Sequence, residues 1–337
     1  MRYLSVCSGI EAATVAWHPL GWEPAGFSEI EQFPSAVLNH NYPKVTNYGD
    51  MTKYKEWKNV GRIDLLVGGT PCQSFSVAGL RGGLADPRGN LMLTYGAIAD
   101  HFKPTWIVWE NVPGVLSSNK GRDFGTFLGM LAELGYGFAY RVLDAQYYGV
   151  AQRRRRVFVV GYLGDWRRAA QVLFESESLC RHTPPSREKG QGFAQDVASC
   201  LRSRDYKGPA TDNLHEGSNL IPSYGIPGNW IGRKPENGGN AVEPMHNVAP
   251  CLTGADKHGV ASQSAVRRLT PIECERLQGF PDDYTRIPYR GKSPENCPDG
   301  PRYKVLGNSM AVPVMRWIGE RIKENEQCNP DPTKPEQ

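Results

Sequence analysis

Short apolar runs alternate with amphipathic segments through the first 163 residues, and this alternation restricts the fold more than any other feature of the chain. Between the runs, apolar residues such as Leu91, Tyr95 and Ile98 recur at helical spacing. Alternating strands and helices predict an α/β fold, a doubly wound Rossmann-like sheet with helices on both faces. The strands are expected at 3–7, 24–28, 63–67, 106–109, 139–143 and 157–162.

The composition changes after Leu163. The residues that follow are rich in Pro, Gly, Ser and Asn and carry no long periodic run, which predicts an inserted, irregular domain. Helical spacing returns at 270–278, where Thr270 and Glu273 are placed as a capping box, and again after Asn308. We therefore expect a first domain at 1–163, an insert at 164–300, a C-terminal helix at 301–325 that completes the first domain, and a disordered tail at 326–337.

Charge and cysteine content limit the class of protein. With 39 Lys and Arg against 35 Asp and Glu, the chain is mildly basic, and its cations cluster at 153–156, 202–207 and 267–268, which suits a polyanionic partner. Eight cysteines in 337 residues are too few for a disulfide scaffold, and no signal peptide or membrane span is evident. We expect a reduced, soluble, cytoplasmic protein with no membrane partner.

A thiol follows the third predicted strand. The apolar run 63–67 continues through Gly68, Gly69, Thr70 and Pro71 to Cys72, which places this thiol on a rigid turn at the carboxyl end of a sheet. Open α/β sheets bind their ligands at that edge. An isolated cysteine is by default an inert core residue, but a cysteine at this position favours a nucleophile.

Two other strand ends carry features of a nucleotide site. The first strand leads into a tight turn at Gly9, where backbone N–H groups can approach a cofactor. Glu29 follows 20 residues later at the end of the next strand, a spacing that suits an acid binding ribose hydroxyls. Asp50, beside Met51, is placed to hold an adenine edge. Taken singly, each acid reads as a solvated strand end, but together they predict an adenosine-type cofactor.

An acid and a basic run complete this edge. Glu110 ends the strand at 106–109 and would face the same edge as Cys72. Where the chain enters the strand at 157–162, alternation puts Gln152, Arg154 and Arg156 on one face and the two intervening arginines on the other. A charge run is ordinarily a solvated face, but the strand that follows favours one set of arginines pointing into the site.

In their order along the chain, these blocks resemble the signature motifs of bacterial and phage DNA (cytosine-5) methyltransferases, over nearly the whole length. The family's nucleophile loop is similar to residues 71–73, its acid motif to residues 110–112 and its base-contacting motif to residues 152–156. The blocks at 267–281 and 307–309 resemble those that support the recognition domain and complete the cofactor pocket. In one departure, Glu11 and Ala12 stand where the family commonly has glycines.

The resemblance implies a role for each site residue and implies no metal. The catalytic residues would be Cys72, Glu110, Arg154 and Arg156. The residues that contact the substrate would be Gln73, Ser76, Asn111 and Gln152. The residues that bind S-adenosylmethionine would be Cys7, Ser8, Gly9, Ile10, Glu29, Ile30, Asp50, Met51, Pro71, Leu91, Asn308, Ser309 and Met310.

The resemblance also implies a reaction. The Cys72 thiolate would add to carbon 6 of cytosine so that carbon 5 can take a methyl group, with Glu110 at ring N3 and Arg156 at O2. Because that carbon is inaccessible inside a duplex, the cytosine would be flipped out of double-stranded DNA read by the insert. We expect a monomer. The sequence leaves open whether the enzyme accompanies a separately acting restriction endonuclease, protects phage DNA or acts alone.

Three other functions compete with this interpretation. An RNA (tRNA) cytosine-5 methyltransferase could use the same scaffold, but the large insert argues for a reader of duplex DNA. A catalytically inactive DNA-binding homologue is disfavoured by the intact set of Cys72, Glu110 and Arg156. A nicotinamide-dependent oxidoreductase fits the fold but not the Pro-Cys-Gln loop.

The insert contains an internal sequence repeat. Residues 197–208 and 248–259 share the pattern Val-Ala-x-Cys-Leu-x-x-x-Asp-x-x-Gly, which suits either two strand-plus-turn units or two loops presented to one partner. Cysteines and histidines also occur here, at spacings that match no ordinary zinc module: Cys180, His182, Cys200, Cys251 and His258. No residue-to-base code can be read from such irregular loops, so the target sequence is not predicted.

Overall fold

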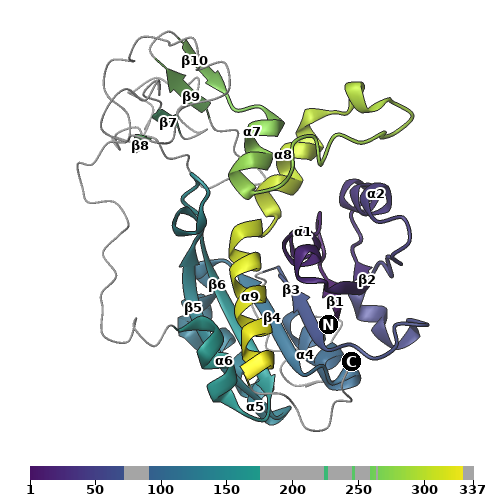
Figure 1. Cartoon of the computed structure of the whole chain (residues 1–337), viewed down its shortest axis with the longest axis vertical. Helices are drawn as coiled ribbons and strands as arrows, with labels where there is room; N and C mark the ends of the chain where they lie inside the picture. The colour runs from purple at the N-terminus through teal and green to yellow at the C-terminus, as the bar shows by residue number, and fades with distance from the viewer. Residues whose placement is uncertain (72–90, 175–223, 227–244, 247–258, 263–264, 329–337) are drawn as a thin grey trace.

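The computed structural model describes residues 1–71, 91–174, 224–226, 245–246, 259–262 and 265–328. Within them, six strands form one mixed sheet in the order β2-β1-β3-β4-β6-β5 (Figure 1). All six overlap the predicted runs, which confirms the α/β fold. The strands are β1 (Arg2–Val6), β2 (Glu23–Ser28), β3 (Leu65–Gly68), β4 (Trp106–Asn111), β5 (Tyr136–Asp144) and β6 (Arg155–Leu163).

One strand runs against the others. β2, β1, β3 and β4 pair in parallel, whereas β6 pairs antiparallel with both β4 and β5. Parallel neighbours need a crossover of about a dozen residues or more. Only residues 145–154, which include the 3₁₀ helix η7 (Ala145–Tyr148), join β5 to β6. The short connection therefore forces a hairpin, a feature that strand–helix alternation does not predict.

Both faces of the sheet are buried under helices. In β1, Tyr3 enters one hydrophobic core and Leu4 the other, and Trp106 and Ile107 of β4 divide in the same way, because successive side chains point to opposite faces. The first core lies under α1 (Ala12–Trp17), α6 (Trp166–Leu173) and α9 (Val312–Cys328). The second lies under α4 (Leu91–Phe102), α5 (Arg122–Glu133) and the 3₁₀ helix η2 (Met51–Glu56).

Helix α6 extends the first domain beyond the composition change. Its residues Ala169, Val172 and Leu173 are fully buried in the first core, although they follow Leu163, where the insert was expected to begin. The helix is amphipathic, but it is short and polar in overall composition, so a boundary drawn at a change of composition misses it. We propose that the first domain continues through Phe174.

Helix α9 returns from the far end of the chain to the first core. It packs between α1 and α6, and the Trp17 indole donates a hydrogen bond to the Met315 carbonyl over 2.7 Å. It also runs further than predicted, since Glu326 accepts hydrogen bonds from the Trp106 indole (3.0 Å) and Arg168 (2.9 Å). The disordered tail predicted from 326 is therefore wrong for residues 326–328, because a buried arginine and indole hold the last helical turn.

Part of the insert forms a second, antiparallel sheet in the order β10-β9-β7-β8, beyond the tips of β5 and β6 (Figure 1). Its strands are β7 (Tyr224–Ile226), β8 (Met245–His246), β9 (Gly259–Ser262) and β10 (Ala265–Arg268). The internal sequence repeat lies outside the described residues at 197–208 and 248–258. The same holds for all five Cys and His residues named above.

β10 leads into α7 (Pro271–Gln278), which begins with the predicted capping box: Thr270 and Glu273 exchange side-chain to backbone hydrogen bonds of 3.3 and 2.7 Å. In the described part of the chain, no helix is long and apolar enough to cross a membrane. The remaining helices are α2 (Gln32–Asn41), α8 (Asp299–Asn308) and the 3₁₀ helices η1 (His18–Leu20), η5 (Pro113–Leu116), η6 (Ser118–Gly121) and η11 (Pro294–Asn296).

Candidate active site

The carboxyl ends of β1 to β4 open into a cavity of about 460 Å³. The predicted residues that line it are Cys7, Gly9, Glu29, Ile30, Asp50, Met51, Pro71, Leu91, Glu110, Asn111, Arg154, Arg156 and Asn308. The lining residues that sequence reasoning missed are Ser28, Glu31, Pro34, Gly49, Gly69, Thr70, Val112, Val305 and Gly307. Most of these adjoin a predicted residue, so their place beside a strand end was the available signal.

The rest of the predicted set falls into two groups. Cys72, Gln73 and Ser76 lie outside the described residues, and Pro71 is the last described residue before them. The residues that are described but do not line the cavity are Ser8, Ile10, Gln152, Ser309 and Met310.

The loop after β1 exposes backbone to the cavity. Cys7, Gly9 and Glu11 have φ values of 50°, 57° and 65°, in the left-handed region that side chains rarely adopt. The Gly9 N–H donates to Glu29 Oε2 over 2.8 Å, which ties this loop to the end of β2. A Cβ added at Gly9 would meet no atom within 4 Å. A ligand can therefore approach the main chain at Gly9 closely.

Glu11 faces the core and not the cavity. Its carboxylate accepts hydrogen bonds from the Thr14 N–H (3.1 Å) and from the hydroxyls of Ser5 and Thr14, so that it caps α1. The residue is 1% exposed, and burial raises the pKa of its carboxyl. The acidic residue that stands where a glycine was expected therefore leaves the cavity open.

Two acids and an apolar residue form the cofactor side of the cavity. Glu29 Oε1 accepts the Glu31 N–H over 2.8 Å, and burial raises the pKa of Glu29. A carboxylate has about four acceptor sites, so Glu29 can also receive ribose hydroxyls. Asp50 Oδ1 accepts the Thr52 N–H over 2.9 Å and caps η2. Ile30, 73% exposed, offers an apolar face to a base. These groups fit an adenosine-type cofactor.

Cys7 is not suited to be the nucleophile. Burial, and then the negative charge of Glu29, raise the pKa of its thiol to about 12. Its Sγ lies 3.4 Å from the Met51 Sδ. Because the thiolate is the reactive form of cysteine, the protonated thiol of Cys7 lines the cavity at neutral pH without reacting.

The end of β3 is held close to β4. A Cβ at Gly68 would come within 2.7 Å of the Val6 carbonyl oxygen, so this position needs glycine, and one at Gly69 would lie 2.9 Å from Glu110 Oε2 and displace that carboxylate. Thr70 accepts hydrogen bonds from the Trp109 indole (3.0 Å) and from the Asn111 amide (2.9 Å). The chain therefore enters the segment of Cys72 from a fixed point beside Glu110. The Asn111 amide, predicted to touch substrate, is engaged with Thr70 in this arrangement.

Glu110 and two arginines form the second side of the cavity, opposite the residues assigned to the cofactor. Arg156 Nε lies 3.1 Å from Glu110 Oε1, with the two side chains 15% and 11% exposed. Arg154, from the same predicted face, donates to the Ser309 carbonyl over 2.6 Å. Burial raises the pKa of Glu110, although the charges of Arg154 and Arg156 oppose this. A carboxyl of raised pKa can give a proton or hydrogen bond to a ring nitrogen, while the guanidinium holds an oxygen nearby.

Gln152 lies on the predicted face but serves a different contact. Its side chain is fully buried and donates to the Leu277 carbonyl of α7 over 2.8 Å. Gln278 is likewise fully buried, with its amide against the Leu306 and Ser309 carbonyls. Gln152 thus ties the entry of β6 to α7, and it does not line the cavity.

Comparison with known proteins is consistent with this geometry. Residues 1–324 match the model of the C-5 cytosine-specific DNA methylase family. A DNA N-6-adenine-methyltransferase of Escherichia phage P1 is 38% identical, over 95% of this chain and 61% of that protein, so the chain spans less than two thirds of that relative. The orphan methyltransferase M.SPRI of Bacillus phage SPR is 37% identical over 96% and 97% of the two chains.

Among solved structures, the crystal structure of the S. pombe Dnmt2 methyltransferase superposes with a TM-score of 0.60, covering 96% of this chain and 99% of that one. Its sequence is only 18% identical. At that identity the likeness establishes the fold of the chain and no more.

Proposed function

The chain belongs to the C-5 cytosine-specific DNA methylase family, and we propose from this premise that it methylates carbon 5 of a cytosine flipped out of a specific duplex DNA sequence, through a covalent bond to Cys72. S-adenosylmethionine, the cofactor of this family, supplies the electrophilic methyl group when it is bound. One observation supports the assignment above others. A single cavity contains the Glu110–Arg156 pair, the end of β3 that leads toward Cys72, and the loop of Gly9 next to Glu29.

Each side of the cavity has its own task in this mechanism. The backbone at Gly9, the Glu29 carboxylate and the face of Ile30 would bind and orient the cofactor. Glu110 would donate a hydrogen bond or proton to ring N3, and Arg156 would hold O2, where negative charge gathers. Both interactions make carbon 6 electrophilic enough for the Cys72 thiolate.

The reaction balances in bonds and protons with these residues, the methyl donor and one base. The Cys72 thiolate would form a bond to carbon 6, and the C5–C6 electron pair would then bond to the methyl group that S-adenosylmethionine supplies, while the electrons of the broken S–CH3 bond stay on its sulfur. A proton given to N3 by Glu110 would return to the Glu110 carboxylate when the ring is restored. A base, which water can supply, removes the C5 proton. The electrons of that C–H bond restore the C5–C6 double bond as the C6–S bond breaks, which returns the thiolate.

The name of the phage P1 relative points to a different atom, the N-6 amino group of adenine. That name belongs to a protein of which the chain spans 61%, and methylation of an exocyclic amine needs neither a thiol adduct nor an acid at a ring nitrogen. The buried Glu110–Arg156 pair is matched to the N3 and O2 edge of a pyrimidine, which supports cytosine.

Cys72→Ser should abolish methyl transfer to duplex DNA and leave S-adenosylmethionine binding intact, because serine lacks the low-pKa nucleophile that addition to carbon 6 requires. Nucleoside mass spectrometry after incubation measures 5-methylcytosine and N6-methyladenine separately, and 5-fluorocytosine DNA should trap the wild-type enzyme covalently. Cys328→Ser, which changes an exposed thiol at the end of α9, is the matched control.

Full activity of Cys72→Ser would remove the nucleophile assignment. N6-methyladenine as the product would replace cytosine as the target, and methylation of tRNA in preference to duplex DNA would favour the RNA enzyme. Absence of any adduct or product in the wild type would favour an inactive DNA-binding homologue.

We propose further that the enzyme acts as a monomer in the cytoplasm of a bacterium or phage-infected host. The phage origin of both relatives supports this setting. The word orphan in the name of the SPR relative supports action without a dedicated restriction endonuclease. Light scattering measures the molar mass of the free protein and of its DNA complex, and so tests whether the protein is a monomer.

A further inference from the structure

The loop that carries Gly9 needs support from elsewhere in the molecule. Residues other than glycine cost free energy in the left-handed region and persist there only when the surroundings hold them, and Cys7 and Glu11 both lie in this region. Glu29 holds one side of this loop through the Gly9 N–H. The other side, at Ile10, is held by a side chain 274 residues away in the sequence.

That side chain is Tyr284, in the segment between α7 and α8. Its hydroxyl donates to the Ile10 carbonyl over 2.8 Å and lies 3.0 Å from the Tyr42 hydroxyl. The Asn41 amide donates to the Tyr284 carbonyl over 3.3 Å. Burial raises the pKa of Tyr284, so its hydroxyl keeps the proton that it donates. The contact joins the C-terminal part of the chain to the cofactor side of the cavity.

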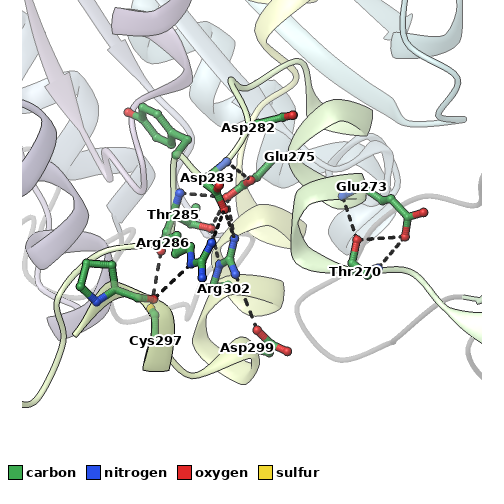
Figure 2. Close-up of polar contacts among 12 residues, drawn as sticks. Thr270, Glu273, Glu275, Asp282, Asp283, Thr285, Arg286, Cys297, Asp299 and Arg302 are labelled. Carbon is green, nitrogen blue, oxygen red and sulfur yellow. Dashed lines mark hydrogen bonds and ion pairs between the residues drawn. The ribbon is translucent and has the colours of Figure 1, made fainter. Parts of the chain in front are cut away.

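A buried carboxylate holds Asp283 and Thr285, the two residues that flank Tyr284 (Figure 2). Glu275 of α7 accepts the N–H groups of both flanking residues, Asp283 over 2.8 Å and Thr285 over 2.9 Å. Arg302 of α8 lies 3.2 Å from Glu275 and donates to the Thr285 hydroxyl over 2.9 Å. Glu275 and Thr285 are fully buried. The backbone on each side of Tyr284 is thus held by one carboxylate, and the ring has little freedom to leave Ile10.

We propose that Tyr284 is a positioning residue for the methyl-donor site: its hydroxyl, placed by Glu275 and Arg302, fixes the Ile10 carbonyl and so the loop that presents Gly9 to the cofactor. The inference rests on the proposed function, because it takes the cavity beside Gly9 as the cofactor site. Tyr284 touches neither the cavity nor the residues assigned to the reacting base, so it acts on binding of the donor and not on the chemical step.

The test removes one oxygen atom. Tyr284→Phe keeps the ring, which packs on Phe280 with centroids 4.8 Å apart, and deletes only the hydroxyl. Calorimetric titration with S-adenosylmethionine in the absence of DNA should show affinity lowered roughly fivefold to tenfold, the effect of one lost hydrogen bond. In steady-state assays KM for S-adenosylmethionine should rise by a similar factor, with kcat at saturation unchanged.

Tyr303→Phe is the matched control, since the Tyr303 hydroxyl bonds the Leu269 carbonyl, far from the loop in the sequence and outside the cavity lining. A general loss of stability would affect both variants, but only Tyr284→Phe should weaken cofactor binding. Equal affinities in wild type, Tyr284→Phe and Tyr303→Phe would overturn the inference while leaving the proposed function intact. A wild type that does not bind S-adenosylmethionine would instead overturn the proposed function.

Hydrogen exchange on the wild type gives a test that does not depend on a variant folding. Saturation with S-adenosylmethionine should slow amide exchange both at residues 7–11 and at residues 283–285, because the two segments are joined through one hydroxyl. Protection confined to residues 7–11 would contradict the role given to Tyr284.

Discussion

At the scale of single residues, the site depends on carboxyl groups whose environments differ. Glu110 is buried between strands and next to guanidinium groups, whereas Glu11 is buried among hydroxyls and caps a helix. Both have raised pKa values because burial disfavours the charged form. Only Glu110 lines the cavity. Two buried glutamates therefore differ in what they face: Glu110, at the end of β4, lines the cavity, whereas Glu11 caps α1 and supports the fold.

The raised pKa of Glu110 has a consequence for the pH dependence. A raised pKa keeps the carboxyl protonated to higher pH than a free carboxyl, so any step that needs this proton slows as the pH rises through that pKa. Single-turnover rates of methyl transfer should fall at high pH in the wild type. Glu110→Gln should lower the rate by about 10²-fold or more and remove this fall, since an amide does not titrate there.

Glu133→Gln, on the exposed surface of α5, is the control and should keep both the rate and the pH profile. An unchanged high-pH decline in Glu110→Gln would mean that another group is responsible.

At the scale of elements, α7 and α8 are joined by the buried pair of Glu275 and Arg302. The side chain of Arg302 is 7% exposed and that of Glu275 fully buried, and Thr285 shares hydrogen bonds with both (Figure 2). The next residue of α7, Arg276, pairs with Asp282 over 2.6 Å, but these side chains are 65% and 50% exposed. Both arginines form ion pairs but only one pair is buried, so comparing the two shows how burial changes the contribution of an ion pair to stability.

Arg302→Met should destabilise the protein by about 3–5 kcal/mol, because it leaves the Glu275 carboxylate buried without its cation. Arg276→Met should change the free energy of unfolding little, since water and salt already screen the exposed pair. Urea unfolding followed by circular dichroism measures both. Equal losses in the two variants would show that burial does not decide the strength of this contact.

At the scale of the whole molecule, two parts of the chain are built differently. The strand ends of the six-stranded sheet form the cavity together with residues of α2, α4 and α8, and α7 and α8 pack on the same first core. The segment between α6 and α7 contains the small antiparallel sheet. We propose that this segment, residues 175–268, reads the DNA and that the remainder carries out the chemistry.

Exchange of residues 175–268 for the matching segment of M.SPRI should therefore change the DNA sequence that is methylated and leave S-adenosylmethionine affinity within about twofold, since additivity holds for sites without shared partners. Bisulfite sequencing of DNA from cells that express each chain measures the target. An unchanged target in a folded, active chimera would contradict this division.

The amino-acid sequence alone was sufficient to locate the strands, the capping box at Thr270, the order of the motifs and most of the cavity lining. These features depend on period, turn chemistry and position at a strand end, which neighbours in the chain determine. The predicted alternation appears in the burial of this run, because alternation is a local property: Gln152 and Arg154 are buried and Arg156 is partly buried, whereas Arg153 and Arg155 are exposed.

Only the tertiary structure decided what those side chains contact. The sequence did not show that β6 runs antiparallel, that Gln152 bonds Leu277, that Glu11 faces the core or that Tyr284 holds Ile10. Gln152 and Tyr284 meet partners 125 and 274 residues away, and no periodicity in a single chain records a pairing over that distance. Local physics determined where the functional groups stand along each element, and packing between distant elements determined which of them reach the cavity.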